Sequence, residues 1–173
     1  MAVYGISVWM MSFLDSEGNP TDAQGMTTEA DIDNLTQTFD DDPRAGYVGA
    51  VSFAQGFEPM EGSFTFKGIS EEFLTAIMNS VNGEASIQLN ASADDDVSGN
   101  SVKYELILRG KIMEYPTGGS FSANETTEFT LGMRINSWRR NFGASTHAYN
   151  PRLQEWMVNG VNKFAARKQA LGL

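Results

Sequence analysis

The chain has 173 residues, 41% of them hydrophobic, and its 22 acidic and 12 basic side chains give a formal charge of −10. With no cysteine and one histidine, it lacks the residues for disulfides, thiolate catalysis, iron–sulfur clusters or a cysteine- or histidine-rich zinc site. The acidic balance disfavours a protein that grips nucleic-acid phosphates. We expect one domain over residues 1–173, with a core of its own.

The N-terminal run from Ala2 to Leu14 is apolar, but no basic residue precedes it and it is too short to cross a membrane. We therefore expect neither a signal peptide nor a membrane span. Both alternating faces of this run are hydrophobic, so one face is expected in the core and the other against a neighbouring molecule. Residues 1–56 as a whole are expected to form an extended N-terminal segment and loop.

Segments in which apolar and polar residues alternate, bounded by turn residues, dominate the chain after residue 60 and predict half-buried strands. Their apolar residues, such as Phe64 and Phe66, fall on one face. The predicted strands span 62–68, 85–91, 102–109 and 128–135. Because the segment between the second and third strands is rich in turn residues, we expect these two strands to form a hairpin.

Two helices are expected. Ser70 is a suitable N-cap for the first, followed by two glutamates that the helix dipole favours. An apolar stripe then runs from Phe73 to Val81, and Gly83 is expected to end the helix. A second, short helix is predicted from Lys163 to Ala170. The fold class is therefore mainly β, a β-sandwich or barrel with one packed α-helix and a short C-terminal helix.

The sequence offers little for catalysis or metal binding. Ser145 and His147 lie two residues apart, but a catalytic triad needs a third group and an oxyanion hole. The aspartate runs 40–42 and 94–96 lack the spacing of a calcium-binding loop. We expect no catalytic residue, no cofactor and no metal site, and hence no enzyme.

Charge is distributed unevenly along the chain. Residues 1–100 hold 17 acidic and two basic side chains, a net −15, whereas residues 101–173 hold five acidic and ten basic side chains, a net +5. One interpretation is that the fold mixes these charges in space. The other is that an acidic face of one molecule meets a basic face of the next, which would steer a head-to-tail association.

The C-terminal stretch from Trp156 to Leu173 resembles the end of the major tail tube protein of contractile-tailed phages and R-type pyocins. In that family an Asn-Gly-Val-Asp/Asn step, here at 159–162, precedes a short charged helix that closes in Leu-Gly-Leu, here at 171–173. The segments Asp42-Pro-Arg-Ala-Gly-Tyr-Val-Gly-Ala-Val51 and Phe57-Glu-Pro-Met-Glu-Gly-Ser-Phe-Thr-Phe66 are also similar to family segments. The resemblance covers roughly residues 35–173 in consistent order.

The resemblance implies a subunit of hexameric rings that stack into the inner tube of a phage tail, through whose lumen the genome passes without specific binding. It implies a virion component, assembled in the host bacterial cytoplasm. The implied partners are further copies of the chain, the tail sheath, the tape measure, the baseplate and the tail terminator. No membrane is involved.

Two sets of residues are candidates for this function. Contacts between subunits or rings are expected in the early loop and the C-terminal stretch, at Arg44, Gly46, Gly49, Asn159, Gly160, Val161, Leu171 and Leu173. Polar strand faces are candidates to line the lumen, although a sheath-facing position is the open alternative. The lumen candidates are Ser86, Gln88, Asn90, Glu128 and Thr130.

Two alternatives remain open. The tube could belong to an R-type bacteriocin or another contractile injection system that carries no DNA. From a different class, the chain could be a monomeric β-sandwich that binds a sugar or peptide through its tryptophans.

Overall fold

The computed structural model describes residues 4–14, 19–23, 27–42, 51–68, 70–80, 84–95, 99–117 and 127–170. The chain is mainly β, as the alternating segments predict. The described helices are α1 (Glu71–Asn79) and α2 (Ala165–Ala170). The described strands are β1 (Tyr4–Leu14), β2 (Pro20–Asp22), β3 (Thr27–Ile32), β4 (Gln37–Asp42), β5 (Val51–Phe57), β6 (Met60–Lys67), β7 (Ala85–Asp95), β8 (Ser101–Glu114), β9 (Glu128–Phe142), β10 (Ser145–Asn150), β11 (Glu155–Val158) and β12 (Val161–Asn162).

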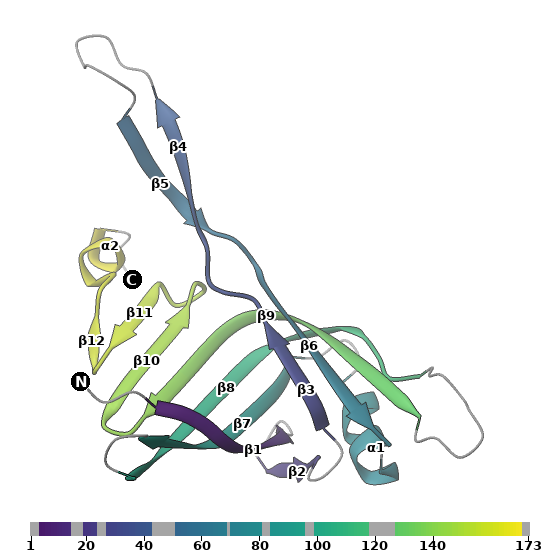
Figure 1. Ribbon diagram of the computed structural model, residues 1–173. Helices are drawn as coiled ribbons and strands as arrows, with labels where there is room; N and C mark the ends of the chain where they lie inside the picture. Colours follow the sequence, from purple (N-terminus) through teal and green to yellow (C-terminus); the bar gives the residue numbers. More distant parts are fainter. Residues whose placement is uncertain are drawn as a thin grey trace.

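Strand β9 organises the main sheet. One of its edges pairs with β8, and its other edge pairs first with β6 and then, further along, with β10. From β9 the sheet continues on one side through β8 and β7 to β1 and β2, and on the other through β10 and β11 to β12. Strand β3 pairs with β6, and together they curl over the sheet in front of β7 and β8 (Figure 1).

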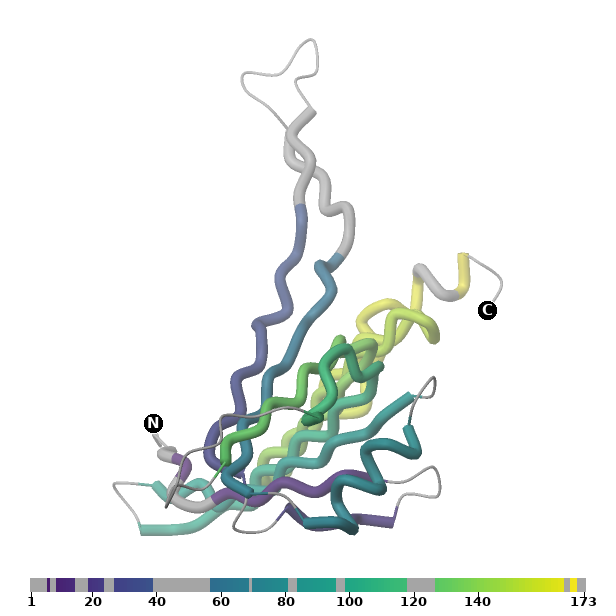
Figure 2. The backbone as a smooth tube through the Cα atoms, turned by 90° about the vertical axis from the view of Figure 1, so that its right-hand side faces the viewer, coloured from purple at the N-terminus to yellow at the C-terminus, as the bar shows by residue number. Residues whose placement is uncertain are grey.

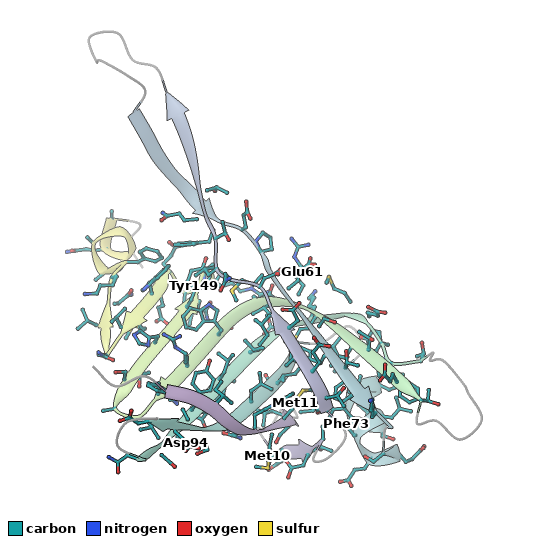
Figure 3. The ribbon with its side chains drawn as sticks, in the orientation of Figure 1. Met10, Met11, Glu61, Phe73, Asp94 and Tyr149 are labelled. Carbon is teal, nitrogen blue, oxygen red and sulfur yellow. The ribbon has the colours of Figure 1, made fainter. Side chains whose placement is uncertain are left out.

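The core fills the space beneath β3 and β6. Phe64 and Phe66 of β6 are fully buried, and Ile87 of β7 lies opposite Leu108 of β8 with no exposed surface, as the alternation predicts. The expected hairpin of the second and third strands is confirmed, although both strands are longer than predicted. In β1, Met11 faces the core and Met10 is exposed on the opposite side (Figure 3).

Helix α1 closes one end of this core. The Ser70 hydroxyl accepts a hydrogen bond from the Phe73 amide at 3.2 Å, which confirms Ser70 as the N-cap. Phe73 is fully buried and lies edge-on to Phe13, with ring centroids 6.4 Å apart. The helix ends at Asn79, earlier than predicted, because the Ser80 amide and hydroxyl both bond the Ile77 carbonyl. The predicted stop at Gly83 lies outside the described residues.

The C-terminal helix is also shorter than predicted. Lys163 and Phe164 form a turn, and α2 begins only at Ala165. The cause is Asn162, whose side-chain oxygen accepts hydrogen bonds from the amides of Trp156 and Phe164 at 3.1 and 2.9 Å. Asn162 therefore ties β12 to β11 and shapes the turn that follows.

Strands β4 and β5 form a separate antiparallel pair that runs from Gln37 opposite Phe57 to Asp42 opposite Val51, with a shift in register between Thr38 and Phe39. They run away from the main sheet, and β4 can be followed leaving it in both views (Figures 1 and 2). A two-stranded ribbon without further packing is only marginally stable in water. Its base must therefore be held by other parts of the protein.

Candidate functional site

The main sheet has two faces. We call the side toward β3 and β6 the core side and the opposite side the polar side. All five lumen candidates lie on the polar side: Ser86, Gln88 and Asn90 alternate with buried residues of β7, and Glu128 and Thr130 alternate with core residues of β9. The two groups are separated by β8 and are not adjacent. Glu128 forms an ion pair with Lys67 at 3.4 Å.

Glu105 is the centre of a hydrogen-bond network on the polar side. Its carboxylate accepts bonds from the side-chain amides of Asn141 at 2.6 Å and Gln88 at 2.9 Å, and from the Lys103 ammonium at 3.1 Å. The bond from Asn141 is the main cause that holds the pKa of Glu105 below its usual value, helped by Lys103 and Arg139 and opposed by burial. The network joins β7, β8 and β9.

Cations also gather on the polar side. Arg109 and Lys111 of β8 and Arg134 and Arg139 of β9 are exposed there, and within the described residues none of them forms an ion pair. Among the described residues of this side, Lys103 is paired with Glu105 and Lys67 with Glu128. Polyanions are attracted to such a surface. The middle of the polar side is therefore basic, next to the neutral strip of Ser86, Gln88 and Asn90.

The segment from Asn159 to Val161 is a tight turn between β11 and β12. Asn159 and Gly160 have φ angles of 48° and 82°, as the two central residues of a type I′ hairpin turn require. The Asn159 amide donates to the Thr146 carbonyl at 2.7 Å, and its side chain accepts from the Thr146 amide at 2.9 Å. These bonds give Asn159 and Gly160 a local structural role. Val161 is 57% exposed beside them.

Five of the predicted contact residues lie outside the described residues, in segments 43–50 and 171–173. These residues are Arg44, Gly46, Gly49, Leu171 and Leu173.

An aromatic cluster holds the base of the β4–β5 ribbon. Phe57, at the end of β5, lies 5.3 Å from Tyr149 of β10, 5.0 Å from Trp156 of β11 and 6.4 Å from Phe164, measured between ring centroids. Tyr149 is labelled at this position in Figure 3. Ring contacts of this kind stabilise a packing arrangement beyond the area they bury. This cluster could not be predicted from the sequence, because Phe57 is far along the chain from its other three members.

The described residues show no arrangement suited to catalysis or metal binding. His147 contacts the Arg140 guanidinium at 3.4 Å, and within the described part of the chain no hydrogen bond joins it to Ser145. No group of three or more histidine, aspartate and glutamate side chains among the described residues could hold a metal ion. No helix in the described ranges is long and apolar enough to span a membrane.

Comparison with protein families gives a match over residues 13–172 to the family described as phage tail tube protein FII. No curated protein matches the chain. Among solved structures, a chain from the "Cryo-EM structure of the anti-feeding prophage (AFP) baseplate, 6-fold symmetrised" is similar with a TM-score of 0.49 and 14% identity. The likeness covers 82% of this chain and 97% of that one.

Proposed function

The chain belongs to the phage tail tube protein FII family, and we propose that it assembles into hexameric rings. These rings stack into the inner tube of a contractile tail. The lumen of this tube conducts the genome during ejection. The family resemblance seen in the sequence is confirmed. The chain is a structural tail tube subunit, and its place is the virion tail. The observation that carries the proposal is the family match over nearly the whole chain.

The strand edges support assembly. In the described residues β3 pairs only with β6, and β12 pairs only with β11, so each leaves an edge of unpaired backbone groups. Natural proteins cover or pair such edges. A ring of subunits would cover them with neighbouring copies, and a contact between two different surfaces generates rings or filaments.

Two sets of residues are proposed for this assembly. Val161, with the turn of Asn159 and Gly160, would meet a neighbouring copy, together with the predicted contacts in segments 43–50 and 171–173. Ser86, Gln88, Asn90, Glu128 and Thr130 would face the lumen. The strip on β7 supports a lumen position, because its own side chains carry no cation to hold DNA phosphates, while the four cations lie on β8 and β9.

A tube that carries no DNA is the second candidate. The four cations on the polar side favour it, since a lumen lined by Arg109, Lys111, Arg134 and Arg139 would bind a passing genome. Such a tube would belong to a bacteriocin or another contractile injection system. In either case the sheath, tape measure, baseplate and tail terminator would be the partners, and assembly would take place in the host bacterial cytoplasm.

The test is negative-stain electron microscopy of the untagged protein over a range of concentrations. We expect hollow stacks of six-fold rings, whose amount rises with concentration. Persistent monomers, with or without baseplate proteins to nucleate growth, would contradict the proposal. Monomers whose thermal stability rises with an added sugar or peptide would instead support the ligand-binding module.

A further inference from the structure

The core side of the sheet extends beyond the strands that cover it. Strand pairing places one row of side chains across the sheet from β1 to β12, and β3 and β6 cover only its first part. Met11 at one end of the row is 1% exposed and Val161 at the other end is 57% exposed, and Arg140 between them is also exposed. The row consists of Met11, Leu89, Leu106, Arg140, His147, Val158 and Val161.

We call the less buried part of this side the open face and define it as Tyr104, Leu106, Arg140, Phe142, His147 and Val158. Its apolar members are half-buried. A slot of about 390 Å³ continues it beneath β3 and is lined in part by Tyr104 and Leu106. A contiguous, partly exposed apolar surface of this kind is typical of a protein contact site.

Arg140 is the cation of the open face. Burial raises the pKa of Tyr104, while the charge of Arg140 and its hydrogen bond to the Tyr104 hydroxyl act in the opposite direction. Arg140 also contacts the Nδ1 atom of His147 at 3.4 Å. Within the described residues it forms no ion pair. Arg140 is exposed, and its planar guanidinium can donate two parallel hydrogen bonds to a carboxylate.

The chain itself carries a matching acidic surface. Glu29 and Asp31 are exposed on β3, opposite Thr65 and Ser63 of β6, and within the described part neither forms an ion pair. We call these two residues the acidic edge. Glu29 also lines the slot with Tyr104 and Leu106, so the acidic edge borders the open face within one molecule. Because neither carboxylate is paired within the described part of its own chain, both can bind a second copy.

We propose that the open face of one copy binds the acidic edge of the next copy, with Arg140 pairing with Glu29 or Asp31. The contact joins two different surfaces, so it repeats head to tail and closes into a ring or continues as a filament. This inference rests on the proposed function and names the surfaces by which the subunits meet. It also explains why the apolar residues of the open face are only half-buried in a single copy, since a second copy would cover them.

The experiment uses full-length variants, with assembly measured by sedimentation velocity and electron microscopy. Arg140→Glu is expected to raise the concentration needed for assembly at least tenfold. Its matched control is Arg139→Glu, the neighbouring exposed arginine on the polar side, which is expected to assemble as the wild type does. The paired variant Glu29→Lys with Asp31→Lys is also expected to assemble poorly alone. An equimolar mixture of this variant with Arg140→Glu should assemble from alternating copies. The unchanged arginine of one variant then meets the unchanged carboxylates of the other, and the introduced glutamate meets the introduced lysines.

Thermal unfolding by circular dichroism separates contact effects from folding effects. The inference predicts that Arg140→Glu and wild type unfold at similar temperatures as monomers. It is overturned if Arg140→Glu assembles like the wild type, if Arg139→Glu loses assembly equally, or if the mixture of variants fails to assemble. A lower monomer stability of Arg140→Glu without rescue would assign the arginine to an intramolecular role. Wild-type protein that never assembles overturns the proposed function, and this inference with it.

Discussion

Glu105 accepts hydrogen bonds from side chains on three strands, so its charge state is coupled to the packing of β7, β8 and β9. Only 17% of its side chain is exposed. Bonds to a charged acceptor contribute more to stability than bonds to a neutral one. A glutamine at this position would present an amide group to three donors and could satisfy only some of them.

We therefore predict that Glu105→Gln lowers the free energy of unfolding by about 1–3 kcal/mol at pH 7. Because the pKa of Glu105 is lower in the folded protein than in the unfolded chain, its contribution is fully present above the unfolded pKa. The contribution disappears as the pH falls through the folded pKa. Urea unfolding of both proteins between pH 7 and pH 3 measures this, and the two stabilities should converge toward pH 3. A difference that is constant with pH would show that the charge of Glu105 is not the cause.

At the scale of elements, Gly110 of β8 lies directly against the backbone of β9. A Cβ atom on Gly110 would lie 1.9 Å from the Arg134 carbonyl oxygen, a backbone atom that cannot move without shifting β9. In contrast, a Cβ atom on Gly62 of β6 would lie 3.3 Å from the ring of Phe64. The first position tolerates no side chain, whereas the second requires only a small adjustment.

Gly110→Ala is accordingly expected to destabilise the protein by about 2 kcal/mol or more, as overpacking between strands does. Gly62→Ala is the matched control, with an expected change of less than about 1 kcal/mol. Urea denaturation at pH 7 compares the two variants with the wild type. Equal stabilities of the two variants would contradict the close approach at Gly110.

The elements also show which parts of the fold the sequence could predict. The strands around Phe64, Ile87 and Leu108 were predicted because one face of each is buried and the other is not, which produces clean alternation. Strands β10 to β12 were missed. The core side of these strands is not covered by β3 and β6. Polar residues such as Arg140 of β9 and His147 of β10 therefore occupy positions that are apolar in buried strands, and the alternation of apolar and polar residues is lost.

Part of the candidate site could also be predicted from the sequence. Alternation alone placed Gln88 and Asn90 on the polar side, and the Asn-Gly step at 159–160 indicated the tight turn that the φ angles show. Neither the aromatic cluster around Phe57 nor the open face around Arg140 could be predicted. Both are built by residues from separate strands, and which arginine lacks a carboxylate partner depends on the three-dimensional arrangement.

On the scale of the whole molecule, the structure shows where the unevenly distributed charges of the sequence lie. Exposed carboxylates lie on β3, whereas β8 and β9 carry exposed cations together with the exposed Glu114 and Glu128. Some charges pair within the chain, such as Arg152 with Glu84 at 2.8 Å. An acidic surface of one molecule that meets a basic surface of the next favours head-to-tail association over a symmetric pair that joins like surfaces. The proposed tube would use this kind of contact.

Cryo-electron microscopy of the assembled protein would show both the symmetry of the assembly and the residues in contact. We predict hollow six-fold rings in which the Arg140 guanidinium of each copy lies within about 4 Å of the Glu29 or Asp31 carboxylate of the next, at ion-pair distance. Symmetric dimers, or rings in which the open face is turned toward solvent, would contradict this prediction.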